Sequence, residues 1–228
     1  SSYVSHYISK RIGLETIEFV SITVPTPLDT RPDLILLLKM LCFGVLMACC
    51  SPTFTYSLYI INNISTKYKI NNYFKALVLS IIAMFIILFV NDNRYASLGT
   101  NLISAATTGE HKMLKYDWII KIIVTVLCLC AGFKGGEITP IFSIGSSFGW
   151  LLAHVLELDH QFGAALGYIA MFTGTTQTLV GPIIMGVEQF GPNIIIYGGI
   201  VCITCFICTP PRSIYSNQQR TFLKWNTY

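Results

Sequence analysis

The sequence predicts an all-α membrane protein built from broken helices, and three observations lead to this fold class. Hydrophobic residues make up 53% of the 228 residues and charged residues only 11%, whereas a soluble domain carries about 25% charged residues. Most apolar segments are roughly ten to eighteen residues long, shorter than a simple membrane span. Glycine, proline, serine or threonine interrupts several of them. Such helices are tolerated at membrane depth only where protein buries them or an aqueous cavity adjoins them.

The first apolar segment, Leu34 to Ile61, is long and contains Pro52. A proline inside a helix removes one hydrogen bond and clashes with the preceding turn, which predicts a kink or a break there. Asn62 to Tyr73 contains lysines and asparagines and is predicted to be a polar loop. The next segment, Ala76 to Val90, is predicted to be an apolar helix. Before all of these, Glu18 to Val24 is expected to be a short strand or an extended loop.

Polar or glycine-containing breaks separate the remaining segments. Further helices are predicted over residues 101–107, 118–131, 141–158, 163–173, 181–190 and 194–208. Asn193 is placed to cap the last of them, and Thr209-Pro210-Pro211 ends it. Discontinuous helices whose ends meet near the bilayer midplane recur in membrane ion sites. This organisation favours an ion transporter or channel.

The most informative stretch reads Gly132-Phe133-Lys134-Gly135-Gly136-Glu137-Ile138-Thr139-Pro140. Its glycines allow a sharp turn of the backbone. Thr139 suits the N-cap of a helix, and Pro140 suits the first helical position after it. The amides at such a helix start have no partner within the helix and carry a partial positive charge. Within a membrane, this end is a ready site for an anion.

Glu137 is an ionisable residue at a place where ionisation is expensive, so a functional role is the first hypothesis. Burial disfavours its charged form, whereas the helix N-terminus and Lys134 favour it. A balance of this kind suits a group that exchanges protons. The alternative is a loop glutamate paired with Lys134 at the membrane surface. Spacing alone does not choose between these two interpretations.

The motif and the residues around it resemble the CLC family of chloride channels and anion/proton antiporters. In that family a glycine-rich loop ending in proline opens a helix toward the central ion site. The resemblance covers about Tyr95 to Ser216. It includes residues 95–103, 141–145, 171–176, 184–191 and 213–216, which read YASLGTNLI, IFSIG, MFTGTT, IMGVEQFG and SIYS.

Glu137 and Thr139 are most similar to the bacterial CLC-F fluoride/proton antiporters, because conventional chloride members usually carry apolar residues at these two positions. The resemblance implies that Glu137 transfers protons or gates the pathway beside the anion. It implies anion contacts by the amide of Ile138, the hydroxyl of Thr139 and the phenol of Tyr215. The alternatives are a plain N-cap for Thr139 and an interfacial anchor for Tyr215.

The similarity corresponds to the second of the family's two inverted-topology halves, so we expect an incomplete half of a longer protein with a CLC-type broken-helix fold. It implies a remnant of a preceding helix and loop over residues 1–33. The transmembrane second repeat would follow over residues 34–209, and a C-terminal segment with Tyr215 over residues 210–228.

The function implied by the resemblance is membrane transport of chloride or fluoride, with proton exchange in the antiporter version. A homodimer in the lipid bilayer is also implied, as a multi-pass protein of the plasma membrane. Small residues in the last apolar segments permit close helix contacts of the kind a dimer uses: Gly181, Gly186, Gly198 and Gly199. A conventional voltage-gated chloride channel and a truncated, non-transporting membrane protein are the alternatives.

Other function classes find little support in the residues. No basic face indicates nucleic-acid binding, and no nucleophile elbow, phosphate loop or carboxylate pair indicates an enzyme. Cys202, Cys205 and Cys208 are spaced like metal ligands but lack a fourth ligand nearby, so we expect them to be buried as small apolar residues. No acidic residue or cysteine completes a zinc site with His154 and His160. We therefore expect neither a metal nor a cofactor.

Charged residues also occur inside predicted helices. Lys39 and Lys121 are expected to snorkel or to face polar loops. Glu188, flanked by Gly186 and Gly191, is expected at a helix-packing or interface position rather than in contact with an ion.

Overall fold

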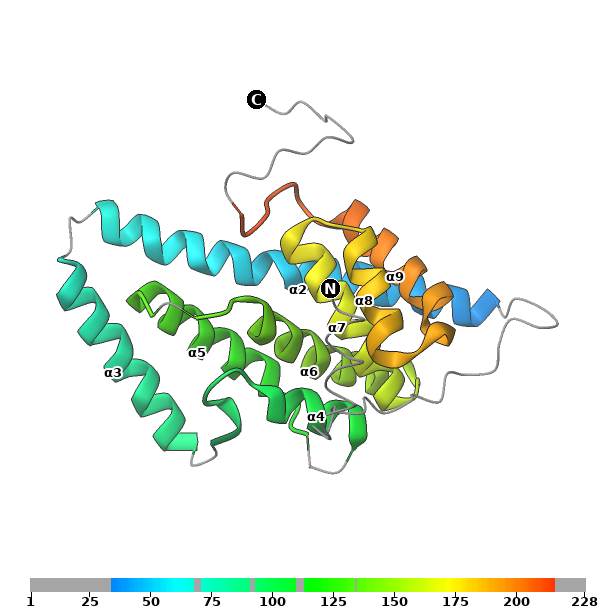
Figure 1. Ribbon diagram of the computed structural model, residues 1–228, viewed down its shortest axis with the longest axis horizontal. Helices are drawn as coiled ribbons and strands as arrows, with labels where there is room; N and C mark the ends of the chain where they lie inside the picture. The colour runs from blue at the N-terminus through cyan, green and yellow to red at the C-terminus, as the bar shows by residue number, and fades with distance from the viewer. Residues whose placement is uncertain (1–33, 68–70, 91–92, 110–112, 134, 216–228) are drawn as a thin grey trace, which may run out of the picture.

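The computed structural model describes residues 34–67, 71–90, 93–109, 113–133 and 135–215, and every regular element within these ranges is a helix (Figure 1). This confirms the predicted all-α class. The expectations for residues 1–33, including Glu18 to Val24, fall outside the described residues. The elements are α2 (Leu34–Lys67), α3 (Asn72–Val90), η1 (Asn93–Tyr95), α4 (Thr100–Thr108), α5 (Asp117–Ala131), α6 (Ile138–Leu156), α7 (His160–Thr176), α8 (Val180–Phe190), η2 (Pro192–Ile194) and α9 (Ile195–Cys208).

Glycine and aspartate set several helix ends where the sequence predicts breaks. Gly109 and Gly132 close α4 and α5 with φ angles of 71° and 95°, in the left-handed region that favours glycine. The carboxylate of Asp159 caps α7 by accepting hydrogen bonds from the amides of Gln161 and Phe162, at 2.9 and 3.1 Å. The predicted cap at Asn193 is wrong, because η2 intervenes and Ile194 is the N-cap of α9.

The longest helix, α2, differs from the prediction at two places. It continues through Pro52, so the predicted break is wrong, and Ser51 and Phe54 on either side of the proline are fully buried. It also continues to Lys67 through the predicted polar loop. Ile61 and Ile64 in this last part line a groove beside the start of α3, and the polar residues between them and Lys67 do not end the helix.

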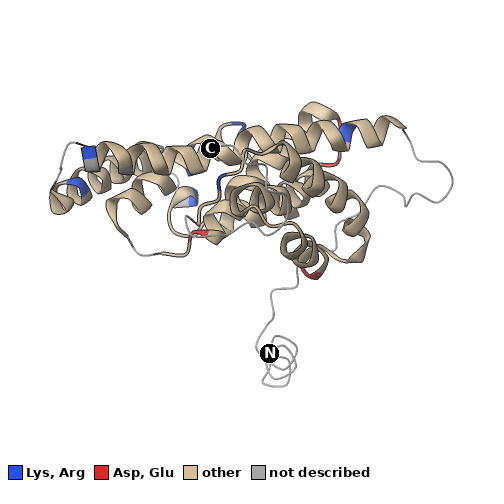
Figure 2. Ribbon diagram, turned by 90° about the horizontal axis from the view of Figure 1, so that it is seen from above, with Lys and Arg blue, Asp and Glu red and all other residues tan. Residues whose placement is uncertain are grey.

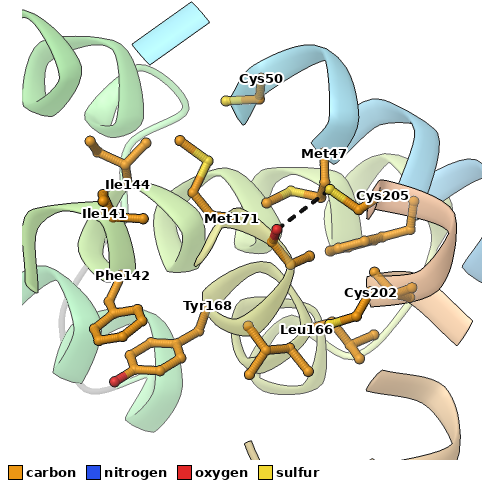
Figure 3. Packing of buried hydrophobic residues seen from close by; sticks show 14 of the residues in the cluster. Met47, Cys50, Ile141, Phe142, Ile144, Leu166, Tyr168, Met171, Cys202 and Cys205 are labelled. Atoms are coloured by element: carbon orange, nitrogen blue, oxygen red, sulfur yellow. Dashed lines mark hydrogen bonds between the residues drawn. The ribbon is translucent and has the colours of Figure 1, made fainter. Parts of the chain in front are cut away.

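The antiparallel pair α6 and α7 forms the centre of the molecule, and glycines allow its close packing. A β-carbon on Gly145 would lie 2.5 Å from the carbonyl oxygen of Gly167, and Gly149 approaches Gly163 one turn further along. Phe142 of α6 stacks on Tyr168 of α7 with ring centroids 4.0 Å apart (Figure 3). Small residues thus bring the two backbones together, and aromatic rings fill the space beside them.

The other helices surround this pair unequally. Helices α2, α8 and α9 pack on one side of α7, whereas α4 and α5 pack against α6 (Figure 1). Helix α3 lies at the edge and contacts α5, and Ala83 is its one buried residue. Of the four glycines expected to permit close contacts, Gly186 and Gly198 receive the side chain of Ile169, whereas Gly181 and Gly199 have open space beside them.

Three of the described helices, α2, α3 and α6, are long and apolar enough to cross a membrane. Charged residues are sparse on the ribbon and lie mostly near helix ends and loops (Figure 2). Large apolar side chains instead face outward, such as Phe89 of α3, which is 92% exposed. A surface of this kind is stable only in contact with lipid or with more protein. The protein is therefore an integral membrane protein.

Candidate functional site

The turn before α6 brings a carboxylate to the start of a central helix. Gly132 ends α5, and the amide of Phe133 then donates to the carbonyl of Cys128 at 3.3 Å. Gly135 and Gly136 follow, both exposed, with open space where a β-carbon would stand. Lys134, the expected partner of Glu137 in the ion-pair alternative, lies outside the described residues.

Helix α6 begins earlier than the sequence predicts. Glu137 is its N-cap, with φ of −78° and ψ of −24°, and its carbonyl accepts the hydrogen bond of Ile141 at 3.4 Å. Thr139 therefore lies within the first turn and is not the predicted N-cap, and Pro140 occupies the third helical position. Proline is tolerated here because the first amides of a helix have no intrahelical acceptor.

The start of α6 remains open on one side within the described residues. Glu137 and Thr139 are half-buried, and Ile138 is 40% exposed. From Pro140 to Ser147 every residue is buried. The carboxylate of Glu137 makes no capping hydrogen bond, so it does not accept a hydrogen bond from the amide of Ile138 or of Thr139. The helix thus presents its positive end, with Glu137 beside it, to the open side.

The C-terminal segment with Tyr215 is tied to the end of α7. Ser213 Oγ donates to the carbonyl of Thr176 at 3.1 Å, and the amide of Ile214 donates to the carbonyl of Thr175 at 3.1 Å. The side chain of Tyr215 is 48% exposed. The segment also contacts α2, where the guanidinium of Arg212 lies 5.2 and 5.3 Å from the ring centroids of two tyrosines, Tyr56 and Tyr59.

The packing of α6 on α7 relates this segment to the start of α6. Gly145 faces Gly167, and Gly149 faces Gly163. Extending this antiparallel register by two turns places the start of α6 level with Thr173 to Thr175 at the end of α7. The predicted residues Glu137, Ile138 and Thr139 therefore lie at the same end of the helix pair as the segment that carries Tyr215. No contact between Tyr215 and Glu137 is among those described.

A second polar cluster, not predicted from the sequence, surrounds the start of α5. The carboxylate of Asp117 is fully buried and accepts hydrogen bonds from the hydroxyl of Tyr95, from the amide of Leu114 at 2.8 Å and from Arg94 at 3.3 Å. Burial, and then the hydrogen bond to Asp117, raise the pKa of the Tyr95 phenol above its usual range. The phenol therefore stays protonated and remains a donor to the carboxylate.

Lys121 joins this cluster to α4 and α6. It is 1% exposed, and its ammonium donates to the carbonyls of Tyr95 and Ser97 at 3.0 and 2.9 Å. Its Cε and the hydroxyl of Ser143 both lie within 2.7 Å of the position a β-carbon on Gly99 would take. Of the two expectations for Lys121, contact with a polar loop is confirmed and snorkelling is wrong. In the sequence, the i, i+4 spacing of Asp117 and Lys121 shows only that the two residues lie on one face of α5.

The remaining predicted residues lie apart from the start of α6. Glu188 is exposed on α8, at a surface position rather than within the core. His154 and His160 stack on each other and on Trp150, with the two histidine ring centroids 5.7 Å apart. Among the predicted apolar cysteines, Cys202 and Cys205 are buried in α9 (Figure 3), whereas Cys208 is exposed, so its predicted burial is wrong.

Comparisons with known proteins relate the chain to one family of membrane proteins. Residues 1–209 match the family described as voltage gated chloride channel. A chloride/fluoride channel protein of Pseudomonas syringae pv. tomato is 35% identical over 131 residues, covering 58% of this chain and 28% of that protein. The H(+)/Cl(-) exchange transporter ClcA of Vibrio parahaemolyticus is 27% identical over 100 residues, covering 40% of this chain and 21% of that protein.

A solved structure supports the same relationship in three dimensions. The crystal structure of a CLC-type fluoride/proton antiporter matches with a TM-score of 0.84 and 33% identity, over 94% of this chain and 53% of that one. The chain thus spans about half the length of the solved antiporter and less of the two curated relatives. Since the family match covers most of the chain and the helices follow the same fold, the protein belongs to the CLC family of voltage-gated chloride channels and related antiporters.

Proposed function

We propose that this chain forms one half of a membrane pathway for a small anion, fluoride or chloride, and that Glu137 carries the proton exchanged for it. The observation that carries the proposal is the start of α6, where Glu137 and the first amides of the helix face an open side. The names of two relatives and one solved structure, which speak of chloride, fluoride and proton exchange, support the choice of ions.

The role of each residue follows from its chemistry. The amide of Ile138 and the hydroxyl of Thr139 would donate to a dehydrated anion at the positive end of α6. Tyr215 would donate its phenolic O–H from the segment tied to α7 by Thr175 and Thr176. Glu137 would be ionised at the positive end of α6 while the anion is absent and would take up a proton when the anion binds beside it, because two negative charges at one buried site repel each other.

The proposal extends to the assembly that surrounds this half. A second half would cover the open side of α6, since the solved antiporter is almost twice as long as the matched region. Exposed apolar side chains on α8 and α9, such as Val180 and Ile195, suit a homodimer contact in the bilayer. A bacterial-type transporter of this kind would work in the plasma membrane, where it would move halide between cell and surroundings.

Ion flux from proteoliposomes tests the proposal. Two proteins would be reconstituted: this chain alone, and this chain joined behind the first half of the Pseudomonas syringae relative. Fluoride and chloride release would be followed with ion-selective electrodes, and proton uptake with a pH dye inside the vesicles. We expect anion flux with opposing proton movement from the joined protein and none from the chain alone.

Matched variants make the result specific to the start of α6. In the joined protein, Glu137→Gln should abolish proton movement and Tyr215→Phe should reduce anion flux, whereas Glu188→Gln on the exposed face of α8 should leave both unchanged. A joined protein that folds, as judged by size-exclusion chromatography, but moves neither ion would refute the proposal. That outcome would favour a non-transporting membrane protein.

A further inference from the structure

A groove of about 160 Å³ lies between the end of α2 and the start of α3. It is at the edge of the molecule, far from α8 and α9 (Figure 1). Apolar side chains form most of its wall, and one lysine stands among them. The lining includes Ile61 and Ile64 of α2 and Phe74, Lys75, Val78 and Leu79 of α3.

The groove opens at the level where a membrane meets water. Helix α3 has 19 residues and therefore spans about 28 Å, close to the thickness of the hydrocarbon core of a bilayer. Its first turn thus lies near the lipid headgroups. Tyr73 in that turn is 87% exposed, and tyrosine is enriched at this level of membrane proteins. Asn71 caps the turn by accepting the amide of Tyr73 at 3.1 Å.

The mouth of the groove carries positive charge without acidic side chains on either helix. Lys75 is half-buried at the groove, and exposed Lys67 ends α2. Neither α2 nor α3 contains aspartate or glutamate. Helix α5, which packs against α3, begins with Asp117, but that carboxylate is engaged by Arg94 and Tyr95. Basic positions gather at this end of the molecule in Figure 2.

We propose that this groove binds one anionic phospholipid. Its phosphate would lie against the ammonium groups of Lys75 and Lys67, and the first part of one acyl chain would lie along Ile61, Ile64 and Val78. An apolar slot that is open toward lipid and headed by lysines at headgroup level matches both parts of such a molecule. Beyond the groove, the rest of the acyl chain would lie along the apolar outer face of α3. This inference does not depend on which ion is transported.

Native mass spectrometry of the 228-residue chain in mild detergent tests the site. The protein would be titrated with dioleoyl phosphatidylglycerol or with dioleoyl phosphatidylcholine. We expect one adduct of phosphatidylglycerol to form at lower lipid concentration than any adduct of phosphatidylcholine. Lys75→Gln should weaken this adduct about fivefold, the effect of removing one lysine at an anionic surface. Val78→Phe, which fills the groove, should weaken it as well.

Two control variants separate the groove from general lipid contact. Lys39→Gln removes one lysine near the opposite end of α2, and Leu77→Phe enlarges an exposed side chain of α3 outside the groove. Both should bind phosphatidylglycerol like the unaltered protein, and thermal unfolding should show that all four variants fold. Equal adducts of the two lipids, or equal losses in the groove and control variants, would overturn the proposal. Competition by glycerol phosphate alone would also overturn it, since the acyl chain would then play no part.

Discussion

A β-carbon on Gly145 would lie 2.5 Å from the carbonyl oxygen of Gly167 and 2.6 Å from the β-carbon of Met171. No side chain separates the two backbones at this point, and neither neighbour is the flexible end of a side chain. The contact therefore sets the distance between α6 and α7.

Gly145→Ala should lower the stability of the protein, because the added methyl group forces the two helices apart. Overpacking of this kind costs about 1–3 kcal/mol. The matched control is Gly199→Ala in α9, where nothing lies within 4 Å of the new carbon and alanine favours the helix over glycine. Thermal unfolding in detergent measures both. An equal unfolding temperature for the two variants would contradict the packing of α6 on α7 described here.

Asp117→Asn should destabilise the junction of η1 and α5. The substitution removes the charge that Arg94 and Tyr95 engage in a buried site, and breaking such a pair costs about 3 kcal/mol. The free energy of unfolding would be compared with that of Tyr95→Phe and of the double variant. The two losses should be less than additive because the residues share one hydrogen bond. Full additivity would show that the bond contributes nothing.

Arg212→Gln should loosen the C-terminal segment without unfolding the helices. The guanidinium of Arg212 lies over the rings of Tyr56 and Tyr59, and exposed cation–π contacts contribute about 0.5–1 kcal/mol. Amide hydrogen exchange of Ser213 to Tyr215 should become faster. Arg212→Lys, which keeps the charge, is the control and should show a smaller increase. Unchanged exchange in Arg212→Gln would mean that the bonds to Thr175 and Thr176 hold the segment alone.

Thr139→Val should weaken the proposed anion contact at the start of α6, whereas Thr139→Ser should preserve it. Valine has the shape of threonine but no hydroxyl, and the loss of one hydrogen bond to a charged group costs about 1.5–3 kcal/mol. The apparent affinity for fluoride during transport by the joined protein measures the effect. Similar affinities for the valine and serine variants would assign Thr139 a purely structural role.

The sequence predicts helices α4, α5 and α8 almost to the residue, because glycines and polar breaks mark their ends. It fails where tertiary contacts override local signals. Pro52 stays within α2, next to the fully buried Ser51 and close to the fully buried Phe54, although its ring disfavours a helix interior. Thr139 is not a cap because Glu137 already adopts helical angles. A capping preference describes one residue, whereas the helix start also depends on where α6 meets α7.

The candidate site was accessible from the sequence only in part. Glu137, Ile138 and Thr139 are adjacent in the chain, so their proximity needs no fold. The position of Tyr215 near the end of α7 depends on hydrogen bonds from Ser213 and Ile214, which no local pattern reveals. The cluster of Arg94, Tyr95 and Asp117 was missed because its members come from different elements. Predicting it required knowledge of how η1 folds onto the start of α5.

The glycine contact between α6 and α7 also constrains how the protein can move. Two helices whose backbones are in contact have little freedom to slide past each other, so α6 and α7 would move as one rigid unit. A tilt of this unit that displaces Glu137 would therefore also displace Thr175 and Thr176. Their carbonyls accept hydrogen bonds from Ser213 and Ile214, so the segment that carries Tyr215 would move as well.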